Sequence, residues 1–300
     1  MNLVDLHLHG AFGVDVLTAR DTDLDRLSLG LASRGVAGFV PTLVPLGLSD
    51  LAATVERLSA WIRSRAEGDG RGAMPLGIHF EGPFVSPARA GALRPARLLD
   101  GQDRRKVDAF LEAAGDVPGR PVVTLAPEVP GGLDLVSLFA KRGWLVFIGH
   151  TDASFATLDE ALARGARHLT HFCNAMRPLH HRDPGAIGWG LLRDGVTVDL
   201  IADLVHLHPE TVRLVLKVKG PSQVALISDA SPPAGLPDGS YVVWGDTLTV
   251  RFGSIRNAAG SLAGSVSLLP EGVANLIALG VPEAEAEACA STVPRRILAS

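Results

Sequence analysis

The segment NLVDLHLHG, residues 2–10, is a short apolar run that ends in two histidines and a glycine, and its pattern recurs along the chain. A run of this length, rich in branched residues and bounded by a turn residue, is typical of a buried β-strand. Because longer helical patterns separate such runs, the sequence predicts βα units and a parallel sheet. Seven further runs follow: GVAGFVPTLV (35–44), MPLGIHFEGPF (74–84), RPVVTLAPE (120–128), GWLVFIGHT (143–151), ARHLTHFCNAM (166–176), TVDLIADLVH (197–206) and QVALISDAS (223–231).

The number of these runs indicates the fold class. Eight strands with helices between them predict a closed (β/α)8 barrel of the TIM-like type. An open, doubly wound sheet gives the same alternation, but the strand count and the layout of the polar residues favour closure. The helices that we expect between the strands include Ser49–Arg65, Asp103–Ala114 and Ser154–Arg164.

We expect a single domain over residues 1–300, with the eight βα units within about 1–235. The remaining segment, 236–300, contains a predicted hairpin over 241–257. Two closing helices are predicted after it, over Leu262–Leu279 and Pro282–Leu298. No low-complexity segment or linker marks a second domain.

The composition narrows the class of protein. The chain has 300 residues, 47% of them hydrophobic, which suits one large barrel core. A net charge of -4 argues against a nucleic-acid or anionic-membrane partner, because both require a basic surface. The start, MNLVDLHLHG, does not resemble a signal peptide, and no apolar run approaches the roughly 18 residues of a membrane span. We therefore expect a cytoplasmic protein.

Six histidines and acids stand where the predicted strands end. His7 and His9 are two residues apart on the first strand, so their side chains point to the same side. The others end four later strands; they are Glu81, His150, His171 and Asp229. In a barrel these positions converge on the carboxyl-terminal mouth, where active sites of this fold lie. A lone histidine at a strand end is more often structural, but six such residues in phase predict a site for zinc or another divalent metal.

At these residues the sequence resembles the amidohydrolase superfamily and, within it, the N-acetylglucosamine-6-phosphate deacetylase family. The matching motifs occur in the family's order and cover nearly the whole barrel. They are DLHLHG (5–10), HFEGPF (79–84), TLAPE (124–128), GHTDAS (149–154), THFCNAM with PLHHRDPG (170–185), IADLVHLHP (201–209), SDASPPAGLPDGSY (228–241) and LAGS (262–265).

The resemblance implies a role for each strand-end residue. Glu81, His150 and His171 would hold a divalent metal, with zinc expected and iron, cobalt or manganese as alternatives. His7 and His9 would hold a second ion, which some members of the family lack.

The resemblance also implies the reaction, which is hydrolysis of the N-acetyl group of an amino-sugar phosphate. A divalent metal lowers the pKa of a water molecule to about 7, and Asp229 would be the general base for that water. His206 would stabilise the oxyanion or, alternatively, only orient a ligand.

Substrate contacts also follow from the resemblance. The backbone at Asn174 and Ala175 would contact the phosphate, and Arg182 would reach the substrate of a neighbouring subunit. A planar guanidinium suits phosphate because it donates two parallel hydrogen bonds. We therefore expect a homodimer; the alternative for Arg182 is a surface residue in a polar loop.

The sequence departs from the family's pattern in two places. Where the family carries a histidine that contacts the sugar, this chain has Leu93, so that polar contact is lost or supplied elsewhere. The family's terminal strands, which form a small β-sandwich, have no counterpart before DLHLHG or after the final RILAS. We expect the first strand and the barrel bottom to be covered differently.

Two other functions stay open at this point. One is a related amidohydrolase that acts on a different N-acyl or cyclic amide, which the Leu93 substitution favours. The absence of a lysine at the end of the fourth strand, where Glu128 stands, disfavours subtypes with a carbamylated lysine. The other is a catalytically silent, sugar-phosphate-binding barrel, but the predicted base and ligands are all present.

Overall fold

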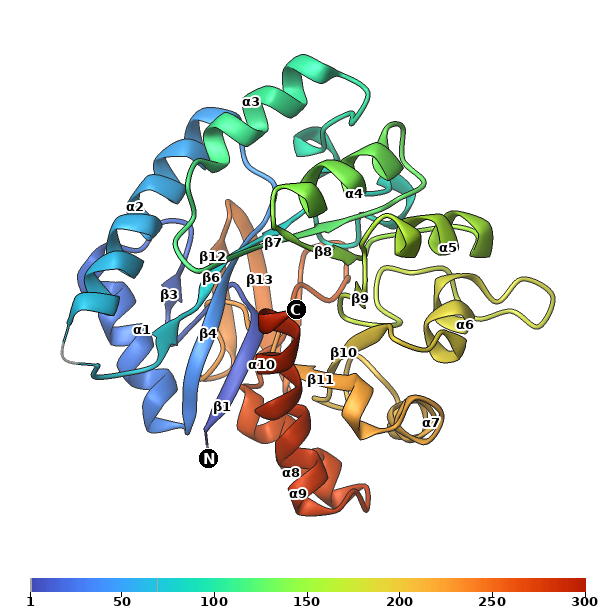
Figure 1. Cartoon of the computed structure of the whole chain (residues 1–300). Coiled ribbons are helices and arrows are strands. Elements are labelled where there is room, and N and C mark those ends of the chain that lie inside the picture. Colours follow the sequence, from blue (N-terminus) through green and yellow to red (C-terminus); the bar gives the residue numbers. More distant parts are fainter. Residues whose placement is uncertain (1, 69) are drawn as a thin grey trace. The chain divides into compact units, whose positions relative to one another are not determined.

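The computed structural model describes residues 2–68 and 70–300. Strands and helices alternate along the chain in the order of a (β/α)8 barrel (Figure 1). Each of the eight predicted runs contains one principal strand. These strands are β1 (Leu3–Leu8), β4 (Val36–Leu43), β6 (Gly77–Glu81), β7 (Arg120–Leu125), β8 (Leu145–Ile148), β9 (His168–Leu169), β10 (Thr197–Ile201) and β11 (Val224–Ile227).

Helices follow most of these strands. They are α1 (Asp21–Ser33), α2 (Leu48–Glu67), α3 (Arg104–Ala114), α4 (Gly132–Lys141), α5 (Phe155–Ala163), α6 (Gly185–Leu192), α7 (Pro209–Lys219), α8 (Leu269–Ala278), α9 (Glu283–Cys289) and α10 (Thr292–Ala299). The three helices named from the sequence are α2, α3 and α5. Asp103 and Ser154 are the N-caps of α3 and α5, since each side chain accepts a hydrogen bond from a backbone amide of the first turn.

The chain forms two compact units. The first comprises residues 1–42, 63–76 and 200–299, and in it β1 pairs in parallel with β4. All six residues of β1 are buried. Helix α10 lies alongside β1 (Figure 1), and the Val4 amide donates to the Ala290 carbonyl oxygen at 2.7 Å. Within this unit, the carboxyl-terminal helices therefore cover the first strand.

The second unit comprises residues 43–62, 77–199 and 300. In it β6, β7, β8 and β9 pair in parallel, in that order. Helices α3 and α4 cover this sheet through packed aromatic rings. Phe110 of α3 lies edge-on to Phe80 of β6 at 5.6 Å between centroids, and Phe139 of α4 lies 5.0 Å from Trp144, the residue before β8. Large buried rings of this kind supply much of the apolar area that stabilises such a layer.

The segment after the eighth strand differs from the prediction in three ways. The predicted hairpin is a three-stranded antiparallel sheet of β12 (Gly239–Val243), β13 (Asp246–Arg251) and β14 (Ser254–Arg256). Helix α8 starts at Leu269 rather than at 262, with Pro270 in its first turn, where a missing amide hydrogen costs nothing.

The last predicted helix is two helices, α9 and α10, separated by two residues. Pro294 lies in the first turn of α10. Proline disrupts the interior of a helix, so a continuous helix through this position is disfavoured.

Three further strands are short: β2 (Gly10–Ala11), β3 (Val14–Asp15) and β5 (Met74–Pro75). None of the helices in the described ranges is long and apolar enough to cross a membrane.

The start of β6 depends on the absence of a side chain at Gly77, where φ is 157°. A Cβ there would lie 2.0 Å from the carbonyl oxygen of Arg120 on β7. We expect Gly77→Ala to lower the free energy of unfolding by at least about 2 kcal/mol, measured by chemical denaturation.

Gly143→Ala is the matched control, because Gly143 has a φ of 78° and no atom near its Cβ position. It should cost roughly 1 kcal/mol, from the backbone conformation alone. Equal losses in the two variants would contradict the steric argument.

Candidate metal centre and active site

Three of the predicted site residues share an unusual backbone conformation. His150, His171 and Asp229 each lie two residues beyond the end of a strand, with φ values of 49°, 33° and 49°. Non-glycine residues rarely adopt positive φ, and those that do cluster at functional sites, where surrounding contacts maintain the strain. The backbone therefore turns sharply at each of these strand ends, and the residue at the turn carries a polar side chain.

The first donor group consists of Glu81, His150 and His171, all buried. The Nε2 atoms of the two histidines lie 3.0 and 3.1 Å from Oε1 of Glu81. The two Nε2 atoms are 3.1 Å from each other. The end of one strand and two loops, far apart in the sequence, thus bring three donor atoms close together.

This arrangement fits a divalent metal. His150 Nδ1 lies 2.9 Å from the backbone oxygen of Arg89, which can only accept, so Nδ1 carries the hydrogen and Nε2 presents a lone pair. Metal–nitrogen and metal–oxygen bonds of about 2.0–2.1 Å place neighbouring donor atoms roughly 3 Å apart. Two imidazoles and one carboxylate at these separations are a donor set that zinc and related ions accept.

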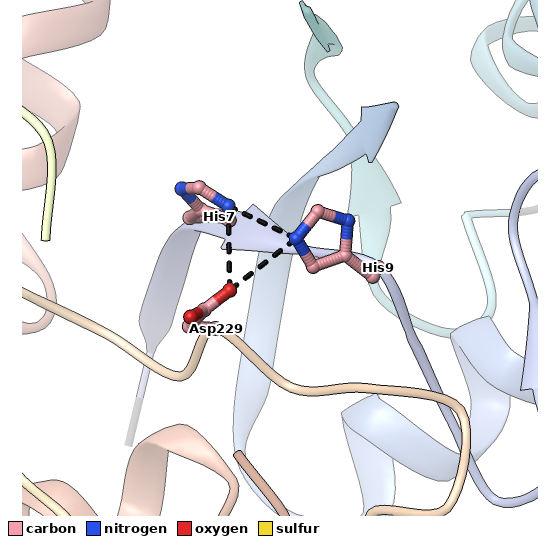
Figure 2. Close-up of side chains that lie close together, drawn as sticks. All are labelled: His7, His9 and Asp229. Atoms are coloured by element: carbon pink, nitrogen blue, oxygen red, sulfur yellow. Dashed lines mark hydrogen bonds and ion pairs between the residues drawn. The ribbon is translucent and has the colours of Figure 1, made fainter. Parts of the chain in front are cut away.

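The second donor group consists of His7, His9 and Asp229 (Figure 2). The Nε2 atoms of the two histidines are 3.2 Å apart, and each lies 3.3 Å from Oδ1 of Asp229. His9 Nδ1 lies 3.1 Å from the carbonyl oxygen of Thr42, so its Nε2 is also left with a lone pair. This group, too, has the donors of a divalent metal site.

His7 and His9 form the pair that their spacing predicts, whereas the contact of Asp229 with both of them was not predicted. Helix-like or strand-like periodicity cannot reveal this contact, because β1 and the loop after β11 are more than 200 residues apart in the sequence. The Asp229 amide also donates to the His7 carbonyl oxygen at 3.0 Å. Asp229 is therefore held by a backbone hydrogen bond as well as by side-chain contacts.

Asp5 lies beneath this second group, inside β1. Burial raises the pKa of Asp5 to about 6, although hydrogen bonds from Ser228 and from the His7 amide oppose the rise. Oδ1 of Asp5 accepts from the amides of His7 and Ser228 at 3.2 and 3.1 Å. Asp5 therefore links β1 to the residue that precedes Asp229.

His206 is held by an aspartate that the sequence analysis did not identify. His206 Nδ1 lies 2.8 Å from Oδ2 of Asp203, and both side chains are buried. Burial raises the pKa of Asp203, but hydrogen bonds from His206 and Val205 outweigh it, and the pKa lies below its usual value. Because Asp203 accepts at Nδ1, the Nε2 atom of His206 is the one oriented away from this pair. In the sequence, the signal for this contact was that Asp203 and His206 stand three residues apart within IADLVH.

A second unpredicted aspartate supports His171. Asp199, in β10, accepts a hydrogen bond from the His171 amide through Oδ1. Its Oδ2 lies 2.9 Å from Nε2 of His168. The sequence contained a signal for this supporting residue: Asp199 is an acid within the otherwise apolar run TVDLIA.

The predicted substrate residues lie outside both donor groups. The side-chain nitrogen of Asn174 is buried and has no hydrogen-bond partner within residues 2–68 and 70–300. Cys173 and Ala175 flank it with φ values of 76° and 50°. Arg182 lies in an exposed loop, where its Nη1 is 2.8 Å from Nε2 of His181.

Burial raises the pKa of the Cys173 thiol to about 12, which disfavours a thiolate role.

Leu93, at the position of the family histidine, is buried. It packs in a small apolar cluster with Val85, Ala90 and Ala126. The side chain that replaces the imidazole therefore anchors its own loop.

Comparisons with known proteins agree on one family, although no family profile matches the chain. The chain is 37% identical over 274 residues to N-acetylglucosamine-6-phosphate deacetylase of Bacillus subtilis, covering 91% of this chain and 68% of that protein. It is 35% identical over 296 residues to N-acetylgalactosamine-6-phosphate deacetylase of Escherichia coli O157:H7, covering 98% of this chain and 76% of that protein.

Solved structures give the same result. N-acetylglucosamine-6-phosphate deacetylase from Thermotoga maritima matches with a TM-score of 0.89 and 30% identity, over 99% of this chain and 78% of that one. The enzyme from Mycobacterium smegmatis, in complex with N-acetyl-D-glucosamine-6-phosphate, matches with a TM-score of 0.88 and 31% identity, over 99% of this chain and 77% of that one.

Fold and donor groups together define a (β/α)8 hydrolase of the metal-dependent amidohydrolase class. Within that class, the chain belongs to the N-acetylglucosamine-6-phosphate deacetylase family. The fold class and the family predicted from the sequence are confirmed.

The two donor groups share no residue, so their contributions to metal binding can be separated. We expect His171→Ala to lower the zinc content of zinc-loaded protein by about one equivalent, because it leaves two of three protein ligands. His7→Ala should leave that ion bound and affect only an ion at the second group. Metal content after gel filtration measures both effects.

His180→Ala is the control, since His180 lies in an exposed loop and belongs to neither group. An equal loss of zinc in His180→Ala and His171→Ala would show that the first group is not the zinc site.

Proposed function

We propose that this chain hydrolyses the acetamide of N-acetylglucosamine-6-phosphate, or of a close amino-sugar phosphate, to acetate and the free amine. The observation that carries the proposal is the convergence of Glu81, His150 and His171 on one point in a chain of the deacetylase family. A relative bound to N-acetyl-D-glucosamine-6-phosphate supports the substrate class.

Each strand-end residue then has a chemical task. A divalent metal held by Glu81, His150 and His171 would supply a water molecule of lowered pKa and a positive charge that stabilises the oxyanion. Asp229 accepts the proton of the attacking water. It then donates that proton to the amide nitrogen, which must depart as a neutral amine. In this fold class the carboxyl ends of the strands form the active-site face, and Glu81, His150, His171 and Asp229 all stand at or just beyond such ends in the sequence.

His206 has two candidate tasks. Asp203 accepts from Nδ1 and fixes the ring, so a proton on Nε2 could be donated to the oxyanion that develops on the acetyl group. Alternatively, His206 only orients a neighbouring ligand. The contact with Asp203 favours the first role, because it fixes the ring with Nε2 directed away from Asp203.

Phosphate recognition is proposed for Asn174, Ala175 and Arg182. The buried Asn174 amide nitrogen is a hydrogen-bond donor with no partner in the described chain, as expected of a group that awaits an anion. Arg182 is exposed in its own chain, which suits a guanidinium that serves a second copy. The homodimer and the cytoplasmic location expected from the sequence stay predictions.

Zinc is the proposed metal, because an imidazole and carboxylate donor set matches its preferences. Iron, cobalt and manganese accept the same donors, so the ion also depends on availability.

The identity of the sugar is the main alternative. The relative from Escherichia coli O157:H7 acts, by its name, on N-acetylgalactosamine-6-phosphate, the epimeric sugar. Leu93 cannot make the polar contact of the family histidine. Because that contact is lost, a different N-acyl or cyclic amide is an alternative substrate. The silent-barrel alternative is disfavoured by the complete set of donors.

Acetate release from zinc-loaded protein tests the proposal. N-acetylglucosamine-6-phosphate, its unphosphorylated counterpart and N-acetylgalactosamine-6-phosphate should be compared on one sample of measured metal content. We expect turnover with a phosphorylated sugar and little without phosphate. Bound zinc with no turnover on any of the three would reject the proposed substrate class.

Asp229→Asn tests the proposed base. The amide keeps the size of the side chain but cannot take up a proton, so kcat should fall by roughly 10²–10⁴-fold. Zinc bound by Glu81, His150 and His171 should remain, as metal analysis would show. Full activity in this variant would remove Asp229 from its assigned role.

A further inference from the structure

Asp152 lies two residues after the donor His150 and receives hydrogen bonds from two arginines. Nε and Nη2 of Arg89 lie 3.1 and 2.9 Å from its Oδ1. The same oxygen accepts from Nε of Arg177 at 3.0 Å, and the Asp152 carbonyl oxygen accepts from Nη2 of Arg177 at 2.9 Å. One residue of the loop after β8 thus binds the loops that follow β6 and β9.

Those are the loops beside the other two donors. Arg89 lies beyond Glu81, in a one-turn helix η1 (Pro87–Arg89) after β6. Arg177 lies six residues beyond His171. Asp152 therefore connects all three segments that carry the first donor group.

Arg89, one of the two arginines bound by Asp152, also contacts the His150 ring through its backbone. Arg89 supplies the carbonyl oxygen that accepts from His150 Nδ1 at 2.9 Å. The Ser86 amide, at the start of η1, donates to the His150 carbonyl oxygen at 3.0 Å. A single helical turn has little stability of its own, so the carbonyl of Arg89 depends on its side chain for a fixed position.

Asp152 is itself held in place. Its amide donates to Oε1 of Glu128 at 2.6 Å, and Oε2 of Glu128 accepts from the Thr151 hydroxyl at 2.6 Å. Glu128 thereby fixes both residues that follow His150. Arg177 Nη1 also pairs with Asp183.

We propose that Asp152 is a positioning residue: through Arg89 it fixes the tautomer and direction of the His150 imidazole at the metal centre. The inference rests on the proposed metal-dependent function. Outer hydrogen bonds of this kind change metal affinity by about 10–100-fold when they are lost. The charged pairs are partly exposed, so their direct contribution to stability is small. The effect should appear in metal binding rather than in folding.

Asp159 provides a matched control within the same unit. On α5, it accepts from Nε and Nη2 of Arg193 at 2.7 and 2.8 Å. It also accepts from Nε1 of Trp189 at 2.8 Å. Asp159→Ala therefore removes a similar set of contacts, but on helix α5, outside the loops that carry the first donor group.

The test is zinc affinity, measured by competition with a chromophoric chelator, for the full chain and its variants. Glu81→Gln identifies the zinc-binding event that belongs to the first group. We expect Asp152→Ala to weaken that event by about 10–100-fold and Asp159→Ala to leave it within about twofold. Asp152→Asn, which keeps an acceptor oxygen, should lie between the two. Thermal unfolding of the metal-free proteins should shift equally in Asp152→Ala and Asp159→Ala.

Equal zinc affinity in Asp152→Ala and Asp159→Ala would overturn the inference. So would a wild-type zinc affinity that does not respond to Glu81→Gln, because no ligand would then need positioning. If Asp152→Ala does not fold, Arg177→Met removes one contact to Asp152 and should still weaken zinc binding more than Asp159→Ala does. Zinc affinity is measured without a sugar, so failure of the proposed substrate would leave this result standing.

Discussion

A histidine can present a lone pair to a metal only at a ring nitrogen that carries no hydrogen, and the rest of the site depends on this constraint. An acceptor must fix the hydrogen on the other nitrogen. The carbonyl oxygen of Arg89 does this for His150, and that of Thr42 does it for His9. By contrast, both ring nitrogens of the buried His168 are engaged by side chains, Thr197 and Asp199. The same residue type is therefore a donor in one place and a structural group in another.

The second requirement is a backbone that turns sharply at the strand ends. Positive φ at His150, His171 and Asp229 is unfavourable for each residue, and hydrogen bonds at the same positions oppose that cost. Asp199 accepts from the amide of His171, and the carbonyl of His7 accepts from the amide of Asp229. The polar groups buried around the donors thus determine where the chain turns as well as which nitrogen is free to bind.

The strands and the strand-end positions could be predicted because they depend on local patterns. Apolar runs that end in a polar residue are visible in any window of ten residues, and all eight contain a strand. The contact of Asp229 with His7 and His9 could not be predicted in this way, since it depends on how distant strands pair.

The prediction of a helix over 262–268 was wrong for a local reason: Gly264 has a φ of 73°, and a β-bridge joins Ser265 to Ala230. Asp152 was missed because its partners lie in two other loops, and motif spacing does not report them.

The buried Leu93 bears on how this chain recognises a sugar. A Cβ on Gly91 would lie 3.7 Å from Cβ of Ala175 and 3.8 Å from Cε1 of His150, so this loop passes close to the donor group. An imidazole at position 93 could read a hydroxyl, but a leucine packed against Val85 and Ala126 can only hold the loop in place. Rigidity at this point lowers the entropic cost of ordering the loop on binding, whereas it removes a polar contact that would discriminate between sugars. Discrimination between sugars must then come from polar groups other than the side chain at position 93.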